Sequence, residues 1–395
     1  MPSSYRPRRK TTRRRGGNFG PAAIILIVIL IGGGLLLYDA FISGRLTGNP
    51  PSVGITLTAA APRATDAPAS TQPTAPLPTT GPTEGGESSI RVFFSDPLTG
   101  RGRGPDDELE EAINRAQRTV DVAIYNISLE NIAGALIAAH ARGVQVRMVM
   151  ESEAMNRNVP TTLAEAGIPI VGDRREGLMH NKFTIIDGQE VWTGSMNYAS
   201  TSAYSDFNNL VQIRSAEAAQ DYTVEFEEMF LDDLFGPDTR ARTPYPNIVV
   251  GGAPVEVYFS PDDGVSERIE EEIQTAQNSI NVLAYSFTSD PLAEAMLKKH
   301  DEGVAVRIVF DQSQVETNTG GEYENLRRAG LDIKMDGING LMHHKVIIID
   351  GKTVITGSYN FSASAERSND ENIIIIRSET LAQEFLLEFN KVWQQ

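Results

Sequence analysis

From residue 90 to the end of the chain, short apolar runs alternate with amphipathic segments of helical period. Residues 90–95 (IRVFFS), 119–128 (TVDVAIYNIS) and 143–150 (GVQVRMVM) have the apolar, β-branched composition of buried strands. The segments between them, such as DDELEEAINRAQ, place acids in the first turn of a predicted helix, where the helix dipole favours negative charge. This alternation indicates an α/β layered unit with a largely buried sheet.

The same pattern occurs a second time. Residues 255–260 (VEVYFS), 279–288 (SINVLAYSFT) and 303–310 (GVAVRIVF) repeat the three strand-like runs. A spacing of about 160 residues is too long for a solenoid repeat. We therefore predict two similar α/β/α sandwich domains, at 90–245 and 246–395, which pack as a pseudo-dimer within a monomeric chain.

The first residues of the chain do not follow this pattern. Residues 1–20 are basic, and 22–38 form an uncharged apolar run that approaches the thickness of a bilayer at about 1.5 Å per residue. We expect a single transmembrane helix over 21–42. The positive-inside rule places 1–20 in the cytoplasm and the catalytic domain on the extracytoplasmic side. A cleaved signal peptide and a buried core helix are the alternatives.

The segment that follows the predicted anchor, 43–89, is rich in Pro, Thr, Ala and Ser and nearly free of large apolar residues. Such a composition cannot bury enough surface to fold. We expect a disordered linker that holds the next domain away from the membrane.

The net charge and the absence of cysteine limit the kinds of site and partner that the chain can have. The chain of 395 residues has no cysteine, which excludes disulfides, thiolate nucleophiles and Cys-ligated metals. Its net charge is -17, and residues 1–20 hold seven of the 35 bases and no acid. The remainder therefore carries 28 bases against 52 acids. A polyanionic surface repels nucleic acid at long range, so nucleic acid is possible but disfavoured as a partner.

The strongest similarity between the two halves is a motif of 23 residues. LMHNKFTIIDGQEVWTGSMNYAS (178–200) matches LMHHKVIIIDGKTVITGSYNFSA (341–363), with a constant offset of 163 residues. In each copy one residue separates His from Lys, Asp follows five residues after Lys, and Gly-Ser-x-Asn ends the next predicted strand. Because successive residues of a strand point to opposite faces, the His and Lys of each copy point the same way.

Two such copies around one point suit a phosphodiester. The lysines and asparagines offer hydrogen-bond donors to the non-bridging oxygens, where negative charge builds in the transition state. One neutral His can attack phosphorus while the other, protonated, gives its proton to the leaving alkoxide. This chemistry needs no metal or other cofactor. The residues that supply it are His180, His343, Lys182, Lys345, Asn197 and Asn360.

The paired motifs resemble the two HKD motifs of the phospholipase D superfamily, and the duplication covers nearly all of 90–395. The resemblance implies a two-domain α/β/α fold, an active site on the pseudo-two-fold axis, a phosphohistidine intermediate and no metal cofactor. It also implies that Asp187 and Asp350 are mainly structural and hold the site through ion pairs.

The family further places an acid downstream of each motif to orient its His. Glu371, 28 residues after His343, matches, whereas the equivalent position after His180 is Asn208. The usual order of the family favours His180 as the nucleophile and His343 as the acid. With each orienting residue assigned to the His of its own copy, Asn208 agrees with that order, because the better supported imidazolium is then the acid.

These observations give a set of candidate residues. The candidate catalytic residues are His180, His343, Lys182, Lys345, Asp187, Asp350 and Glu371. The candidate substrate-binding residues are Asn197, Asn360, Ser195, Ser358 and Asn208. No metal ligands are predicted.

Other repeated residues have simpler interpretations. His344 lies on the opposite strand face from the motif and is interpreted as a structural or surface residue, and His140 and His300 as helix-capping residues. Tyr125 and Tyr285 recur inside predicted strands and could line the pocket, but core packing is the favoured interpretation.

The leading functional prediction is hydrolysis of a phospholipid headgroup ester, as in phospholipase D, because a predicted membrane anchor and a negative domain suit a lipid. The alternatives are a metal-independent nuclease, a transphosphatidylating enzyme like the cardiolipin synthases, and a phosphate-binding module without turnover.

Overall fold

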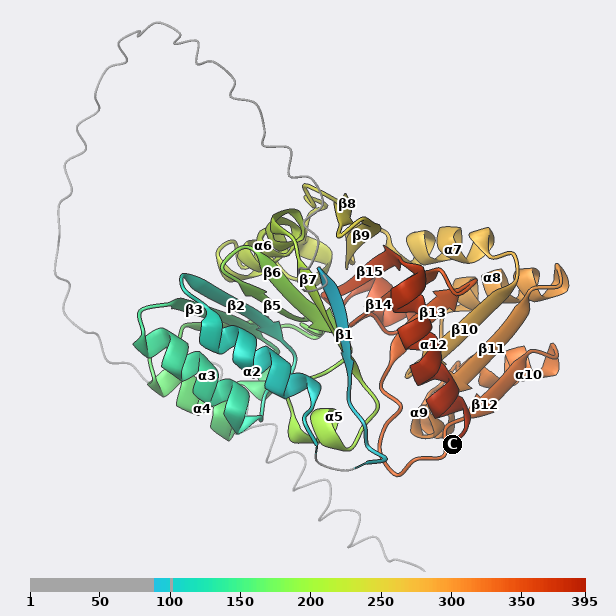
Figure 1. Ribbon diagram of the computed structural model, residues 1–395, viewed down its shortest axis with the longest axis horizontal. Helices are drawn as coiled ribbons and strands as arrows, with labels where there is room; N and C mark the ends of the chain where they lie inside the picture. The colour runs from blue at the N-terminus through green and yellow to red at the C-terminus, as the bar shows by residue number, and fades with distance from the viewer. Residues whose placement is uncertain (1–88, 100–101) are drawn as a thin grey trace, which may run out of the picture. The chain divides into compact units, whose positions relative to one another are not determined.

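The computed structural model describes residues 89–99 and 102–395 (Figure 1). The predicted basic segment at 1–20, the anchor at 21–42 and the linker at 43–89, apart from Ser89, lie outside these residues. In the described part of the chain, every helix is too short or too polar to cross a bilayer. The anchor and the extracytoplasmic location therefore stay predictions.

The first half forms a mixed seven-stranded sheet with the order β1-β7-β6-β5-β2-β3-β4. Strands β2, β3 and β4 are parallel, and the other neighbours are antiparallel. The strands are β1 (Ile90–Phe94), β2 (Thr119–Ile124), β3 (Gln145–Met150), β4 (Ile170–Gly172), β5 (Lys182–Ile186), β6 (Glu190–Gly194) and β7 (Asn209–Arg214). The helices are α2 (Pro105–Arg115), α3 (Glu130–Ala141), α4 (Asn158–Glu165), α5 (Ser200–Tyr204) and α6 (Ala216–Phe230).

The second half repeats this plan in an eight-stranded sheet with the order β12-β11-β10-β13-β14-β15-β9-β8. Its strands are β8 (Asn247–Val250), β9 (Ala253–Ser260), β10 (Ser279–Ala284), β11 (Ala305–Phe310), β12 (Asp332–Met335), β13 (Lys345–Ile349), β14 (Thr353–Gly357) and β15 (Glu371–Arg377). Its helices are α7 (Val265–Thr275), α8 (Asp290–Asp301), α9 (Gln312–Thr317), α10 (Tyr323–Arg328), α11 (Ala363–Arg367) and α12 (Glu379–Trp393). The prediction of two similar α/β domains is confirmed.

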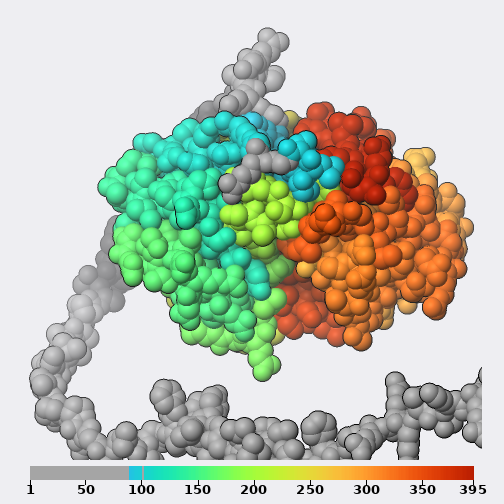
Figure 2. All heavy atoms as spheres, turned by 90° about the horizontal axis from the view of Figure 1, so that it is seen from below, coloured from blue at the N-terminus to red at the C-terminus, as the bar shows by residue number. Residues whose placement is uncertain are grey.

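Each sheet is covered on both faces. One core packs α2 and α3 on the first sheet, and another packs α7 and α8 on the second. A third core is shared, because apolar residues of α6, α12 and both sheets form one contiguous cluster. Phe94 of β1 packs edge-on against Phe385 of α12 at 5.1 Å between ring centroids, and Tyr222 of α6 packs against Phe259 of β9 at the same distance. Figure 2 shows the two halves in direct contact at the surface.

Polar side chains also join the halves inside this shared core. Thr193 donates to Asn372 across the interface at 2.7 Å, and Thr356 donates to Asn209 at 3.1 Å. The amide of Asn209 contacts Nδ1 of His344 at 3.0 Å. His344 is fully buried, so of its two interpretations the structural one holds.

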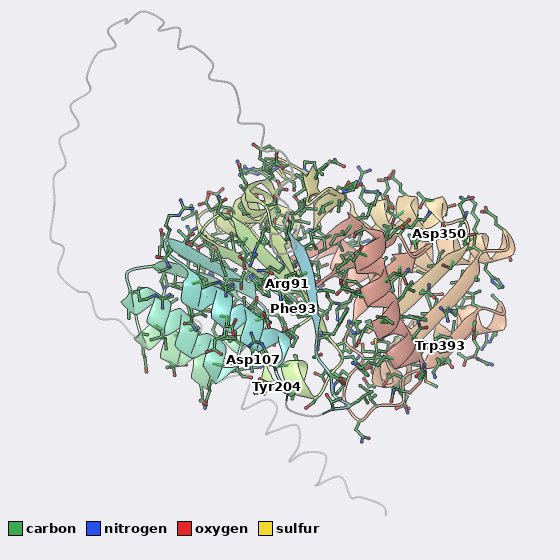
Figure 3. The ribbon with its side chains drawn as sticks, in the orientation of Figure 1. Arg91, Phe93, Asp107, Tyr204, Asp350 and Trp393 are labelled. Atoms are coloured by element: carbon green, nitrogen blue, oxygen red, sulfur yellow. The ribbon has the colours of Figure 1, made fainter. Side chains whose placement is uncertain are left out.

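The motif aspartates lie at the far end of the strands that carry the lysines. Asp350 follows β13 with a φ of 52° and accepts hydrogen bonds from the backbone amides of residues 277, 278 and 279 at 2.7–2.8 Å. Asp187 binds the amides of residues 117, 118 and 119 in the same way. In Figure 3, Asp350 lies beside α7, and α9 is at the opposite end of the sheet.

This placement corrects the inclusion of both aspartates among the candidate catalytic residues. Five residues of strand separate each from its lysine, roughly 16 Å at about 3.3 Å per residue. Burial tends to raise the pKa of each carboxyl, but the three amide donors hold it below its usual value. The resemblance implied ion pairs, whereas backbone amides are the main partners. Both aspartates fix the start of the neighbouring strand, β2 or β10.

We expect Asp350→Ala to lower the free energy of unfolding by about 2–4 kcal/mol, because charge-assisted hydrogen bonds are lost and alanine is strained at positive φ. Asp350→Asn is the matched control. Asparagine keeps one acceptor and tolerates the left-handed region, so its loss should be clearly smaller. Urea denaturation measures both, and an alanine variant as stable as the wild type would contradict this role.

Candidate active site

The two His-x-Lys segments enter the shared core from opposite halves, and each is hydrogen-bonded to the other half. The backbone amide of His180 donates to the carbonyl of Asp370 at 3.0 Å, and that of His343 donates to Phe207 at 2.9 Å. Asp370 directly precedes β15, and Phe207 lies two residues before β7. Each motif is therefore positioned by a strand of the opposite sheet.

The orienting side chains are exchanged between the halves. Nδ1 of His180 lies 2.7 Å from a carboxylate oxygen of Glu371, and Nδ1 of His343 lies 2.9 Å from the amide oxygen of Asn208. The expected pairing of Glu371 with His343 and of Asn208 with His180 is therefore wrong. The two positions are equivalent in the repeat, but the pseudo-two-fold packing turns each one toward the His of the partner half.

The hydrogen-bond network also indicates which nitrogen of each ring carries the proton. The amide nitrogen of Asn208 donates to the carbonyl of Ser202 at 3.0 Å, which leaves its oxygen as the acceptor for His343. Glu371 is likewise an acceptor for His180 when ionised. In the neutral form, both rings therefore carry the proton on Nδ1 and leave the lone pair of Nε2 available for chemistry.

Both motif lysines are buried beside their histidines. Nζ of Lys182 donates to the carbonyl of His180 at 2.7 Å, and Nζ of Lys345 donates to that of His343 at 2.8 Å. Each ammonium has three donors, so these bonds leave further N–H groups that could serve an anion. Within the described residues, no group of three or more His, Asp or Glu side chains is arranged to hold a metal ion.

Tyr125 and Tyr285 are site residues that the sequence analysis assigned by preference to core packing. Each ring contacts the motif His edge-on, with centroids 5.2 Å apart for Tyr125 and His180 and 4.4 Å apart for Tyr285 and His343. Nζ of Lys182 and Lys345 lies over the respective ring at 5.3 and 4.5 Å. Their place in the sequence could have identified them as site residues, because each tyrosine directly follows a strand that pairs with the lysine strand.

Burial dominates the electrostatics of this cluster. It lowers the pKa of His180 to about 4, which Glu371 opposes and Lys182 reinforces. Burial also lowers the pKa of Lys182 to about 7, although the negative charge of Glu371 opposes this shift. Burial and the two lysines hold the pKa of His343 well below its usual value, and the pKa of Lys345 is lowered in the same way. Among these side chains only Glu371 offsets the positive charge of the cluster, and an anion bound there would raise all four pKa values.

The remaining candidates fall into two groups. The amide oxygens of Asn197 and Asn360 are buried without a hydrogen-bond partner among the described residues, so a role in holding substrate stays a prediction for both. Ser195 and Ser358 are fully buried. Ser195 donates to Asn208 at 2.9 Å, and the hydroxyl of Ser358 accepts from the amide of residue 372 at 3.0 Å. Through these contacts both serines support the orienting strands, and substrate binding by them stays a prediction.

Comparison with known proteins places this site in a family. The family model described as "Cardiolipin synthase, PLD-like domain" matches residues 109–230 and 269–393. A protein named phospholipase D from Rickettsia conorii is 39% identical over 132 residues, 33% of this chain and 66% of that protein. A mitochondrial cardiolipin hydrolase of Xenopus tropicalis is 33% identical over 133 residues, 34% of this chain and 63% of its own. These matches thus span slightly less than two thirds of each relative.

A solved structure shares the fold over most of the chain. The phosphatidylserine synthase of Haemophilus influenzae aligns over 78% of this chain and 86% of its own, with a TM-score of 0.58 and 15% identity. At that identity the likeness concerns the fold alone. The two segments matched by the family model are the two halves whose His-x-Lys motifs meet in the shared core. The chain belongs to the family of phospholipase D-like domains.

Proposed function

We propose that this protein hydrolyses the headgroup phosphodiester of a phospholipid, the phospholipase D reaction, through a covalent phosphohistidine. The observation that carries the proposal is the exchange of orienting residues, which holds two Nδ1-protonated imidazoles in one buried cluster beside two lysines. Relatives named phospholipase D and cardiolipin hydrolase support a lipid substrate.

In the first step, Nε2 of neutral His180 attacks phosphorus, and a P–N bond forms as the P–O bond to the headgroup breaks. Protonated His343 gives its Nε2 proton to the departing alkoxide. Bound phosphate favours that protonated form, because its negative charge opposes the burial that lowers the pKa of His343. Lys182 and Lys345 stabilise the charge on the non-bridging oxygens.

In the second step, His343, now neutral, accepts a proton from water as the water oxygen attacks phosphorus. The P–N bond breaks, phosphatidate is released, and both rings return to their starting protonation states. One histidine thus serves as nucleophile throughout, while the other alternates between acid and base.

Glu371 supports the assignment of His180 as the nucleophile, although for a reason different from the one the sequence offered. A phosphorylated imidazole carries positive charge, which the carboxylate at 2.7 Å stabilises. His343 has only the neutral amide of Asn208. Its imidazolium is therefore the less stabilised of the two and the stronger proton donor.

A substrate with a good leaving group separates the two roles. With bis(p-nitrophenyl) phosphate, His343→Ala should still release one equivalent of nitrophenol, since nitrophenolate needs no proton, and then stall as a phosphohistidine. His180→Ala should give no burst. Rapid-mixing absorbance and mass spectrometry of the trapped peptide measure this. A burst in His180→Ala and none in His343→Ala would reverse the assignment.

With phosphatidylcholine, whose leaving group needs a proton, both single variants should lose at least about 10²–10⁴-fold in kcat while keeping the wild-type circular dichroism spectrum. EDTA should not inhibit the wild type. Single-stranded DNA assayed in parallel tests the alternative of a nuclease. Cleavage of DNA alone, with a rate that falls steeply with salt, would overturn the lipid proposal. Tight phosphate binding without turnover of either substrate would indicate a binding module.

The pH dependence tests the partner of His343. Asn208→Asp places a carboxylate on Nδ1 and should raise the pKa of His343 by about one unit or more. An acid must be protonated to act, so activity on phosphatidylcholine is lost as pH rises through this pKa. The alkaline limb of kcat should therefore move to higher pH. Glu371→Gln is the control, and it should lower kcat without that upward move. An unchanged alkaline limb in Asn208→Asp would contradict His343 as the acid.

A further inference from the structure

A small aromatic pocket opens beside His343. Its volume is about 70 Å³, and four aromatic rings line it: Tyr285, Phe287, Phe310 and Tyr323. Tyr285 belongs both to this pocket and to the site, because its ring contacts His343 at 4.4 Å between centroids. The pocket therefore adjoins the imidazole that protonates the leaving group.

The pocket is built at the carboxyl ends of two parallel strands. Phe310 ends β11, and Phe287 lies three residues beyond the end of β10. The two rings stack at 5.8 Å between centroids, and Tyr323 of α10 packs edge-on against Phe310 at 5.3 Å. The carboxyl ends of parallel strands are where open α/β sheets bind ligands.

Two carboxyl side chains, those of Glu322 and Glu324, belong to the lining of the same pocket. Glu322 is 7% exposed, its backbone amide donates to the carbonyl of Phe287 at 3.0 Å, and its carboxylate accepts from the neutral amide of Asn325 at 2.7 Å. Burial, together with Asp290 and Glu294, raises the pKa of Glu322. A cation in the pocket would stabilise its charged form. Glu324, also in the lining, pairs with arginines of its own helix.

In the first half, the positions that match Phe287 and Phe310 are not aromatic. Phe287 forms an isolated bridge with Phe361, and the equivalent bridge in the first half is made by Ile127 with Tyr198. Phe310 at the end of β11 corresponds to Met150 at the end of β3. The two halves therefore match in the histidines, lysines and tyrosines of the site but differ in the residues around them. This asymmetry suits a phosphodiester, because its two ester groups differ from each other.

We propose that this pocket binds the cationic end of the leaving alcohol, an ammonium or quaternary ammonium group of a phospholipid headgroup. The inference rests on the proposed function, in which His180 attacks in line and the leaving group lies on the side of His343. Aromatic faces with a nearby carboxylate attract such cations. The volume, roughly that of two or three waters at about 30 Å³ each, suits a few heavy atoms and is too small for a nucleobase.

The test compares phosphatidylcholine with phosphatidylglycerol of the same acyl chains, using the full chain in detergent. The wild type should favour the choline lipid in kcat/KM by about tenfold or more. Tyr323→Leu and Glu322→Gln should bring this ratio to within about twofold of unity and leave hydrolysis of bis(p-nitrophenyl) phosphate within about twofold of the wild type. Glu316→Gln, an exposed carboxylate of α9 outside the pocket, is the matched control and should change neither.

Tetramethylammonium provides a readout that does not need a lipid. It should compete with bis(p-nitrophenyl) phosphate in the wild type but not in Tyr323→Leu, with potassium chloride at equal ionic strength as the control. Equal use of both lipids by the wild type, or no competition, overturns the pocket proposal while the proposed function stands. If no phosphodiester is cleaved, the proposed function fails. Calorimetric titration with tetramethylammonium then tests cation binding by the pocket, and an absence of binding would overturn the pocket proposal.

Discussion

Two hydrogen bonds across the middle of the molecule hold the rest of the site in register. Glu371 and Asn208 each reach from their own sheet to the histidine of the other, at 2.7 and 2.9 Å. These bonds fix both rings and leave Nε2 of each free of its proton in the neutral state. Neither half contains a site histidine together with its orienting residue, so the paired site exists only at the interface. The shared core of α6, α12 and both sheets holds that interface together.

Burial gives this arrangement its preference for anions. Lys182 and Lys345 are almost wholly enclosed, and their pKa values are lowered accordingly. A bound phosphate group would favour the charged forms of these side chains, so binding and protonation are coupled. The partners are unequal, a carboxylate for His180 and an amide for His343, and this difference suits the two roles proposed for two chemically identical rings.

The repeat in the sequence predicted the two sheets and the meeting of the two motifs, because matched spacing implies matched positions. It could not show which histidine Glu371 would face, since equivalence within a repeat says nothing about exchange across a two-fold axis. The strand pattern favoured a core position for Tyr125, because the alternation of apolar and polar residues does not show where a strand ends. The sequence shows that Phe287 occupies the position equivalent to Ile127. Its possible role in the aromatic pocket is evident only from the structure, in which Tyr285 lines this pocket and also contacts His343.

The contact between Phe94 and Phe385 joins the first described strand to the last helix. A nascent polypeptide that has not yet released α12 from the ribosome lacks one wall of the central core, and with it the support behind both sheets. Assembly of the two-histidine site therefore waits for the synthesis of α12. Proteolytic removal of α12 would remove the same wall, which links the integrity of this helix to the placement of histidines far away in the chain.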